Sequence, residues 1–513
     1  MKATRQCVNF GLIPLCLFVT VGARAQNPWQ FKNWNPPSNE VRVKPKLNCP
    51  DLRSLTGYEF SIITASAIAG TADVPEHCLV SGQILPEIRF EVGLPAAWNR
   101  RLYMFGNGGY AGGFFEWPVS IEQRNLALRH GFAIAVTNTG HDKASEPGAS
   151  FATNLQKLID FAFRSVHTTA ETAKQLIRAY YGQAESHAYF GGCSKGGSQA
   201  LISAQRFPKD FDGVIVGDPM IDYVGSNISS VWTIRALNEA PISSAKAKLL
   251  TERIYAVCDE PDGLKDGLIE NPLKCNFEAS RDLPKCSVDS DGNACFTSNQ
   301  IAAIEKIHAD ILSQGKIIFP GRPVGAEMST LAINGRDADL YFAENFLRYM
   351  AFPEQDPKYD LGQFDFDKDP GRMTLIRQMM NATDSDLSQL QSRGGKIIMY
   401  HGWGDAGLNP SMSVSYYEKV ADRMGPATRN FFRLFMVPGM SHCGGGVGID
   451  RFDTITPLVN WVEKGVAPEQ IIGARIVDGK TVRTRPLCFY PQVAKYKGTG
   501  SIDEAANFVC LQP

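Results

Sequence analysis

The stretch that decides the fold is Tyr189-Phe190-Gly191-Gly192-Cys193-Ser194-Lys195-Gly196-Gly197, which contains the pattern Gly-x-Ser-x-Gly. Residues 186–190 before it have the composition of a short buried strand, and residues 198–206 after it suit a helix. Strand, tight turn and helix form a nucleophile elbow, which exposes the serine hydroxyl at a helix N-terminus where negative charge is favoured. The alternative is a glycine-rich turn whose serine has no chemical role.

Strand and helix patterns alternate around this stretch. Residues 101–105, 131–138 and 213–216 have the composition of buried strands, and residues 161–181 have helical spacing. Alternating strands and helices predict a parallel α/β sheet. The pattern resumes at residues 396–402 and 430–437, each a strand followed by a loop.

The α/β alternation stops between about residue 220 and residue 394, in a segment with four cysteines and many aromatic residues. This insertion follows the strand after the elbow helix, which is a usual place for a lid. We therefore expect an α/β-hydrolase fold with a large inserted lid domain. The expected parts are a signal peptide (1–25), a catalytic domain in two pieces (26–220 and 395–513) and the lid (221–394).

A serine nucleophile needs a base to take its proton and a carboxylate to orient that base. Asp405 and His442 both follow predicted strands, and the order Ser194, Asp405, His442 is that of α/β-hydrolases. His401 is the rival base, but it stands on the strand end and precedes the aspartate. We expect His401 to have a structural role as a hydrogen-bonding residue.

A glycine-rich loop, Gly106-Asn107-Gly108-Gly109-Tyr110-Ala111-Gly112-Gly113, follows the strand predicted at residues 101–105. It lacks the ending of a P-loop and the spacing of a dinucleotide fingerprint, which argues against phosphate binding. A loop placed here, before an elbow, can donate an N–H group to an oxyanion hole. The alternative is a plain flexible turn.

Ten of the 12 cysteines lie after residue 25, and an even number in a secreted protein indicates disulfides. Cys193 adjoins Ser194 and Cys443 adjoins His442, so a bridge between them would tie the elbow to the histidine loop. The alternative is two unrelated buried thiols. The other eight form plausible local pairs by nearness alone: Cys49/Cys78, Cys258/Cys275, Cys286/Cys295 and Cys488/Cys510.

Residues 258–268, with the sequence Cys-Asp-Glu-Pro-Asp-Gly-Leu-Lys-Asp-Gly-Leu, place Asp259, Asp262 and Asp266 within eight residues. Hard oxygen ligands in a tight loop suit Ca²⁺. The loop is not an EF-hand, because the twelfth position counted from Asp262 is Leu273 and not glutamate. The alternative is a solvated Asp/Gly turn.

The N-terminus has the features of a secretory signal. Lys2 and Arg5 precede the apolar residues 10–21, and Ala23-Arg24-Ala25 fits a cleavage site, so the mature chain should begin near Gln26. The alternative is a buried N-terminal helix. The net charge of -1, with both signs spread along the chain, argues against a nucleic-acid partner, and no later run predicts a membrane span. We expect a secreted or periplasmic protein.

Several motifs resemble the tannase/feruloyl esterase family. They are Gly-Gly-Cys-Ser-Lys-Gly-Gly at 191–197, Tyr-His-Gly at 400–402, Pro-Gly-Met-Ser-His-Cys-Gly-Gly-Gly at 438–446 and Arg-Pro-Leu-Cys at 485–488. The resemblance covers most of the mature chain. One departure is Asn107, where several members carry glycine.

The resemblance implies Ser194 as nucleophile, Asp405 as orienting acid and His442 as base, with the backbone N–H groups of Gly109 and Lys195 as the oxyanion hole. It also implies all five disulfides, including Cys193–Cys443.

For the acidic loop, the resemblance implies a structural Ca²⁺ in the lid. Its ligands would be the side chains of Asp259, Asp262 and Asp266 and the carbonyl groups of Leu264 and Leu268.

The family acts on esters of aromatic acids, including feruloylated polysaccharides, chlorogenate and gallate esters, and one branch acts on the terephthalate monoester. We therefore expect a feruloyl esterase, then a tannase, then a terephthalate monoester hydrolase. In the last case Arg348 is a candidate for binding the free carboxylate. A hypothesis of another class is a catalytically inactive hydrolase fold that acts as a secreted binding protein, which predicts a broken triad.

Overall fold

The computed structural model describes residues 31–32, 34–36, 40–113, 118–287, 290–327 and 333–512. The predicted signal peptide, residues 1–25, lies outside these residues.

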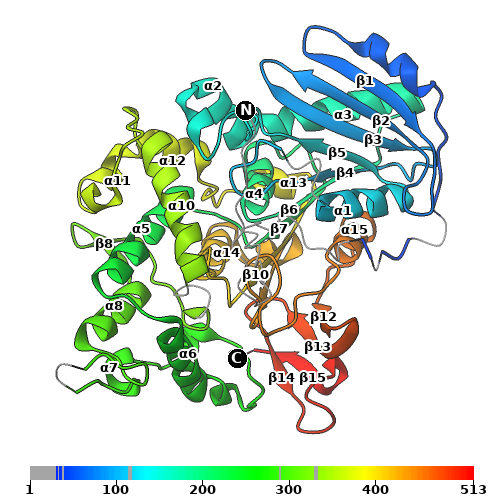
Figure 1. Cartoon of the computed structure of the whole chain (residues 1–513). Helices are drawn as coiled ribbons and strands as arrows, with labels where there is room; N and C mark the ends of the chain where they lie inside the picture. The colour runs from blue at the N-terminus through cyan, green and yellow to red at the C-terminus, as the bar shows by residue number, and fades with distance from the viewer. Residues whose placement is uncertain are drawn as a thin grey trace, which may run out of the picture.

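A mixed sheet forms the centre of the molecule (Figure 1). Within the described residues it has nine strands in the order β1-β2-β3-β5-β4-β6-β7-β10-β11. The strands are β1 (Phe60–Ile68), β2 (His77–Ile84), β3 (Ile88–Pro95), β4 (Arg101–Phe105), β5 (Ala133–Thr137), β6 (His187–Cys193), β7 (Gly213–Gly217), β10 (Lys396–Gly402) and β11 (Phe432–Val437).

The sheet is parallel from β5 to β11 and antiparallel from β1 to β5. The parallel strands β4, β5 and β7 are buried at every residue, as expected for strands that are covered on both faces. The prediction of a parallel sheet therefore holds for the part that carries the elbow. The N-terminal strands β1 and β2, which alternate more strongly in exposure, form an antiparallel extension.

Helices cover both faces of the sheet. On one face α3 (Ser165–Tyr181), α4 (Lys195–Arg206) and α14 (Ser411–Met424) contribute to a common core with the strands. On the other face the core includes residues of α1 (Pro118–Arg129) and α15 (Ile455–Lys464). A short helix, α2 (Leu155–Ile159), precedes α3.

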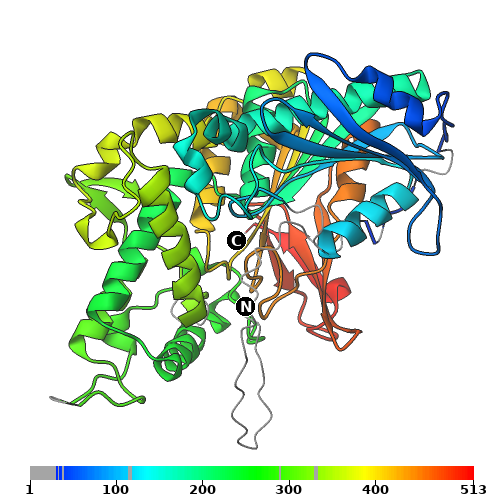
Figure 2. The ribbon, with the colours of Figure 1, turned by 45° about the horizontal axis from the view of Figure 1, so that its top comes forward.

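The chain between β7 and β10 forms an insertion beside the sheet (Figures 1 and 2). Its elements are α5 (Tyr223–Glu239), α6 (Ser244–Cys258), α7 (Ala279–Asp282), α8 (Ser298–His308), β8 (Ile311–Ser313), β9 (Lys316–Phe319), α10 (Ile333–Tyr349), α11 (Asp369–Arg372), α12 (Thr374–Met380) and α13 (Ser388–Ser392). Residues of α5, α10 and α12 share one apolar core, and residues of α6 and α8 share another.

The C-terminal part adds two small antiparallel pairs next to the main sheet (Figure 1). They are β12 (Gln470–Val477) with β13 (Lys480–Cys488), and β14 (Val493–Tyr496) with β15 (Phe508–Leu511).

The strand and the helix of the elbow have other boundaries in the structure than those predicted from the sequence. The strand β6 extends through Gly191 and Gly192 to Cys193 because these residues continue to pair with β7. The helix α4 begins at Lys195, earlier than residue 198, because the carbonyl of Ser194 already accepts the N–H of Ser198 (3.1 Å). The nucleophile candidate therefore stands directly between strand and helix.

Candidate active site

Ser194 lies in a turn that only small neighbours permit. Its φ is 65° and its ψ is −124°, a conformation that costs energy for a residue with a side chain. A Cβ atom on Gly192 would lie 2.7 Å from backbone carbons of Gly196, so both glycines are required by close backbone approach. The backbone N–H of Ser194 donates to the carbonyl of Gly217 on β7 (3.0 Å). This geometry explains why the sequence has the Gly-x-Ser-x-Gly spacing.

Asp405 and His442 form a hydrogen-bonded pair. The Oδ2 atom of Asp405 lies 2.7 Å from Nδ1 of His442, and its Oδ1 atom accepts the N–H groups of Gly407 (2.8 Å) and Leu408 (2.9 Å). Asp405 is buried, which alone would raise the pKa of its carboxyl group. The charges and hydrogen bonds of His442 and His401 outweigh burial and hold this pKa below its ordinary value. Asp405 is therefore a charged acceptor for the imidazole.

His401 contacts the same carboxylate oxygen from the other side. Its Nε2 atom lies 3.2 Å from Oδ2 of Asp405, and its Nδ1 atom lies 2.7 Å from Oγ of Ser413. The side chain of His401 has no solvent exposure. This placement agrees with a structural role, as the sequence suggested, but its direct contact with Asp405 was not predicted.

The pKa of His442 lies above its ordinary value of 6.5. Burial lowers this pKa, but the negative charge and hydrogen bond of Asp405 raise it by more, and the charge of Asp218 adds to the increase. The pair is therefore arranged to stabilise an imidazolium at His442.

The glycine-rich loop after β4 packs directly on the elbow. A Cβ atom on Gly106 would lie 2.9 Å from Cα of Gly196. The N–H of Asn107 donates to Oε1 of Gln199 on α4 (2.9 Å), and its side-chain amide donates to the carbonyl of Thr137 (2.8 Å). Gly109 has a φ of 55°, which glycine adopts without strain. Asn107 thus ties the loop that contains Gly109 to the elbow helix.

Lys195 has a buried side chain, which the sequence did not reveal. Its Nζ atom lies 4.7 Å from the ring centroid of Phe161 and 5.6 Å from that of Tyr223. Within the described part of the chain this amine has no hydrogen-bond partner. Burial, with a smaller effect from Arg206, lowers the pKa of Lys195 to about 7. The sequence predicts a role only for its backbone N–H, which lies at the first position of α4.

Five disulfides connect the described cysteines, and all five pairs match those considered in the sequence: Cys49–Cys78, Cys193–Cys443, Cys258–Cys275, Cys286–Cys295 and Cys488–Cys510. The Cys193–Cys443 bridge closes a separation of 250 residues, with the two Cα atoms 5.9 Å apart. It joins the residue before Ser194 to the residue after His442.

In the acidic loop of the insertion, residues 258–268, aspartate side chains accept hydrogen bonds from the backbone of the same loop. Asp259 accepts the N–H groups of Asp266 (3.2 Å) and Gly267 (3.1 Å), and Asp262 accepts that of Leu264 (2.8 Å). Burial, together with the charges of Asp266 and Asp259, raises the pKa of Asp262 to about 6. Carboxylate oxygens are the kind of ligand that Ca²⁺ prefers. Asp266 is already paired with Arg485, however, and these three aspartates are not among the described groups whose ligand atoms lie within 4.8 Å of one another.

This loop also contacts both the C-terminal strands and the loop that carries His442. Asp266 pairs with Arg485, and its carbonyl accepts from Arg483 (3.2 Å) on the same strand, β13. A Cβ atom on Gly439 would lie 2.8 Å from Cδ2 of Leu268. The loop therefore packs against the segment that leads to His442, a contact that the sequence did not predict.

Closely spaced groups of acidic, histidine and cysteine side chains lie around Asp218. Among the residues that the structure describes, ligand atoms within 4.8 Å of one another occur in two groups: Cys193, Asp218 and Cys443, and Asp218, His401 and Asp405. The two cysteines are joined in a disulfide, and His401 and Asp405 contact each other.

Aromatic residues of the insertion reach the glycine-rich loop. The ring of Phe342 lies 3.7 Å from where a Cβ atom on Gly109 would be, and the Tyr110 hydroxyl donates to the carbonyl of Phe342 (3.0 Å). Arg348 forms an ion pair with Glu344 (3.2 Å), and its Nε donates to the carbonyl of Tyr359 (3.3 Å).

The sheet order, the strained serine turn and the ordered acid–imidazole pair define the α/β-hydrolase class. Within that class the family is also identified. The protein-family model described as "Tannase and feruloyl esterase" matches residues 72–511, and the chain belongs to this family. As a member it is a carboxylic ester hydrolase.

Two curated relatives and two solved structures illustrate the similarity. A mono(2-hydroxyethyl) terephthalate hydrolase of Piscinibacter sakaiensis is 34% identical, over 88% of this chain and 87% of its own. A probable feruloyl esterase B-1 of Aspergillus oryzae is 31% identical, over 83% of this chain and 81% of its own.

Among solved structures, feruloyl esterase B from Aspergillus oryzae is 27% identical with a TM-score of 0.78, covering 90% of this chain and 100% of its own. A tannin acyl hydrolase from Aspergillus niger, 19% identical with a TM-score of 0.73 over 90% of this chain and 94% of its own, shares the fold. Among the described residues, no helix combines the length and apolar character needed to span a bilayer.

Proposed function

We propose that this protein hydrolyses esters of aromatic carboxylic acids through a Ser–His–Asp acyl-enzyme mechanism. The observation that carries the proposal is the 2.7 Å contact between Asp405 and Nδ1 of His442, in a chain whose Ser194 occupies a strained elbow. That contact leaves Nε2 of His442 as the nitrogen that can accept a proton from serine.

In the acylation step, Ser194 Oγ attacks the ester carbonyl carbon while His442 accepts the hydroxyl proton. The oxyanion that forms would be bound by the backbone N–H groups of Gly109 and Lys195. His442 then returns the proton to the leaving alcohol, and the acyl group remains on Ser194. Water, deprotonated by His442, attacks this ester. His442 then returns the proton to Ser194 Oγ as its bond to the acyl carbon breaks, which releases the acid and restores the serine.

Substrates of the feruloyl type are the first choice, followed by gallate esters and the terephthalate monoester. The relatives named feruloyl esterase and terephthalate hydrolase support an aromatic acyl group. Phe342, next to Gly109, is a suitable aromatic wall for such a ring. Arg348 is engaged with Glu344 and Tyr359, so it offers little support for the terephthalate branch.

The segment 221–394 would act as the lid domain, and the pieces 26–220 and 395–513 as the catalytic domain. The lid would hold a structural Ca²⁺ through Asp259, Asp262 and Asp266 and the carbonyl groups of Leu264 and Leu268. Five disulfides support a secreted or periplasmic protein.

The test compares wild type and Ser194→Ala on methyl ferulate, methyl gallate and the terephthalate monoester. We expect the wild type to have its highest kcat/KM on one of these esters, and Ser194→Ala to lose about 10⁵- to 10⁶-fold in kcat while it keeps the wild-type Tm. A variant with near-normal turnover would exclude Ser194 as nucleophile. A folded wild type that hydrolyses no aryl ester would favour the binding-protein hypothesis.

A further inference from the structure

A second buried carboxylate, Asp218, stands at the end of β7, between the strand of the nucleophile and the strand that leads to Asp405. In the sheet Gly217 pairs with Cys193 on β6 and with Tyr400 on β10. The next residue, Asp218, is fully buried and has a φ of 33°, a strained value for a residue with a side chain. The proposed mechanism gives it no role.

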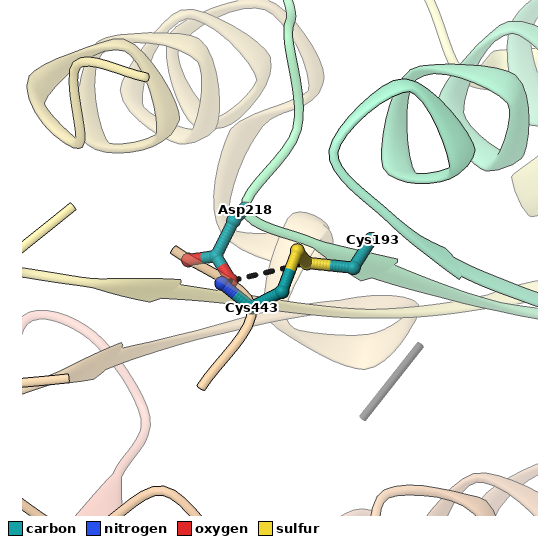
Figure 3. A group of neighbouring side chains, drawn as sticks. All are labelled: Cys193, Asp218 and Cys443. Carbon is teal, nitrogen blue, oxygen red and sulfur yellow. Dashed lines mark hydrogen bonds between the residues drawn. A yellow bond between two sulfur atoms is a disulfide. The ribbon is translucent and has the colours of Figure 1, made fainter. Parts of the chain in front are cut away.

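The carboxylate of Asp218 connects three segments of the site. Its Oδ1 atom accepts the N–H of Gly402 at the end of β10 (2.7 Å), and its Oδ2 atom accepts the N–H of Cys443 (2.9 Å). Figure 3 shows Oδ2 beside the disulfide, 3.2 Å from Sγ of Cys193. One oxygen therefore bonds the end of the strand that leads to Asp405, and the other bonds the residue that follows His442.

The charge of Asp218 also acts on the triad. Its Oδ1 atom lies 3.8 Å from Nε2 of His401, and its charge raises the pKa of His442. Burial raises the pKa of Asp218 to about 6, while the charges of His401 and His442 and the N–H of Gly402 lower it and favour the carboxylate form. The titratable or charged groups around it are His401, His442, Asp405 and Tyr400, with Arg322 and Asp339 of the insertion near the Asp405 loop.

We propose that Asp218 is a positioning residue for ester hydrolysis: it holds the His442 loop against the end of β10 and adds a second negative charge near the imidazolium that forms there. This inference rests on the proposed function. Asparagine has the same shape but only one acceptor oxygen, so it can replace one of the two N–H bonds and none of the charge.

The experiment measures kcat and KM of Asp218→Asn across pH, on an aryl ester that does not ionise. We expect kcat to fall roughly 10- to 100-fold with KM nearly unchanged, since displacement of about 1 Å is costly. Because a negative charge near His442 is lost, the acid limb of kcat/KM should move to lower pH by roughly half a unit or more. A purely structural defect would not move this limb.

Asp453→Asn is the matched control. Asp453 also accepts two backbone N–H groups, from Ile455 (2.9 Å) and Thr456 (3.0 Å), and burial raises its pKa to about 6. It should keep the wild-type kcat and acid limb. Asp218→Glu keeps the charge but displaces it, so it should lower kcat while leaving the acid limb near its wild-type position.

Wild-type kcat and an unmoved limb in folded Asp218→Asn would overturn the proposal, as would an equal loss in Asp453→Asn. If Asp218→Asn does not fold, Asp218→Glu decides, because wild-type kcat in that variant would overturn the positioning role. Ser194→Ala separates the two proposals: if it is inactive while Asp218→Asn behaves as wild type, the proposed function stands and the role of Asp218 fails.

Discussion

Asp405 receives two imidazole rings on one carboxylate oxygen, His442 at 2.7 Å and His401 at 3.2 Å. Its other oxygen accepts two backbone N–H groups. A carboxylate with four donors keeps both its charge and its orientation, and a fixed orientation in turn fixes the ring of His442. The amine of Lys195, in contrast, is buried against two aromatic rings and has no hydrogen-bond partner among the described residues. Burial of a charge without such a partner is unfavourable.

The raised pKa of His442 predicts how activity depends on pH. The base must be neutral to accept the serine proton, so kcat/KM should rise with pH through an apparent pKa above 6.5, the ordinary histidine value. The measurement is kcat/KM from about pH 5 to about pH 10 on an aryl ester without ionisable groups. An acid limb centred below 6.5 would contradict the assigned electrostatics.

Four neighbouring strands precede the candidate catalytic residues and Asp218. The order β6-β7-β10-β11 places the ends of these strands side by side, and the Cys193–Cys443 bridge joins the elbow after β6 to the histidine loop after β11. Parallel strands end at the same edge of the sheet, so residues that are far apart in sequence meet there. The bridge and Asp218 then restrict how far the histidine loop can move.

The double variant Cys193→Ala/Cys443→Ala tests the bridge. Closing so long a separation stabilises the fold by roughly 5 kcal/mol in the chain-entropy model, so the variant should have a lower Tm. Its kcat should fall by up to roughly 100-fold, more than KM changes, because the nucleophile and base lose their common anchor. Kinetics are measured at a temperature where the variant is folded.

The control is Cys286→Ala/Cys295→Ala, which opens a bridge that spans only 9 residues in the insertion. This variant should keep the wild-type kcat. If the first double variant is folded and turns over normally, the bridge has a role in stability alone. Peptide mapping of the non-reduced protein checks the pairing itself.

In the whole molecule, the insertion and the catalytic part are joined at several points. Tyr110 bonds the carbonyl of Phe342 near the glycine-rich loop, and Asp266 pairs with Arg485 of the C-terminal strands. Leu268 packs against Gly439, three residues before His442. A change in the acidic loop therefore has a short path of contacts to His442.

Calcium removal should act along this path. Elemental analysis of protein purified without chelator should find about one Ca²⁺ per chain, and chelation should lower the Tm and reduce activity. Binding at roughly 100-fold above Kd contributes about 3 kcal/mol of stability. Asp262→Asn should lower the Tm in the same way and remove the effect of the chelator.

Asp386→Asn is the control for charge alone, since Asp386 is a half-exposed aspartate in the same insertion that pairs with Arg423 (2.7 Å). It should leave the calcium content and the chelator effect unchanged. Protein without calcium, and with a Tm that is insensitive to chelator, would identify residues 258–268 as a plain turn.

Local patterns in the sequence predicted the strand–turn–helix of the elbow, the strand ends at 402 and 437, and the segment inserted between two strands of the sheet. Each depends on neighbours within a few residues, such as the glycines that a tight turn requires around Ser194. The same reasoning could have found Asp218, because it directly follows the buried strand that ends at Gly217. The boundaries of β6 and α4 differ from the predicted ones because pairing with β7 and the bond from Ser198 to the carbonyl of Ser194 are set by the folded backbone.

The contacts that tune the site were decided only by tertiary structure. That Asp218 bonds Cys443, that His401 meets Asp405, and that the amine of Lys195 lies between Phe161 and Tyr223 all depend on which strands are neighbours. Strand order results from packing over the whole chain and leaves no signal at the individual positions. Candidate catalytic residues can therefore be proposed one by one along the chain, whereas their charges and their mutual contacts arise only when the ends of β6, β7, β10 and β11 lie side by side.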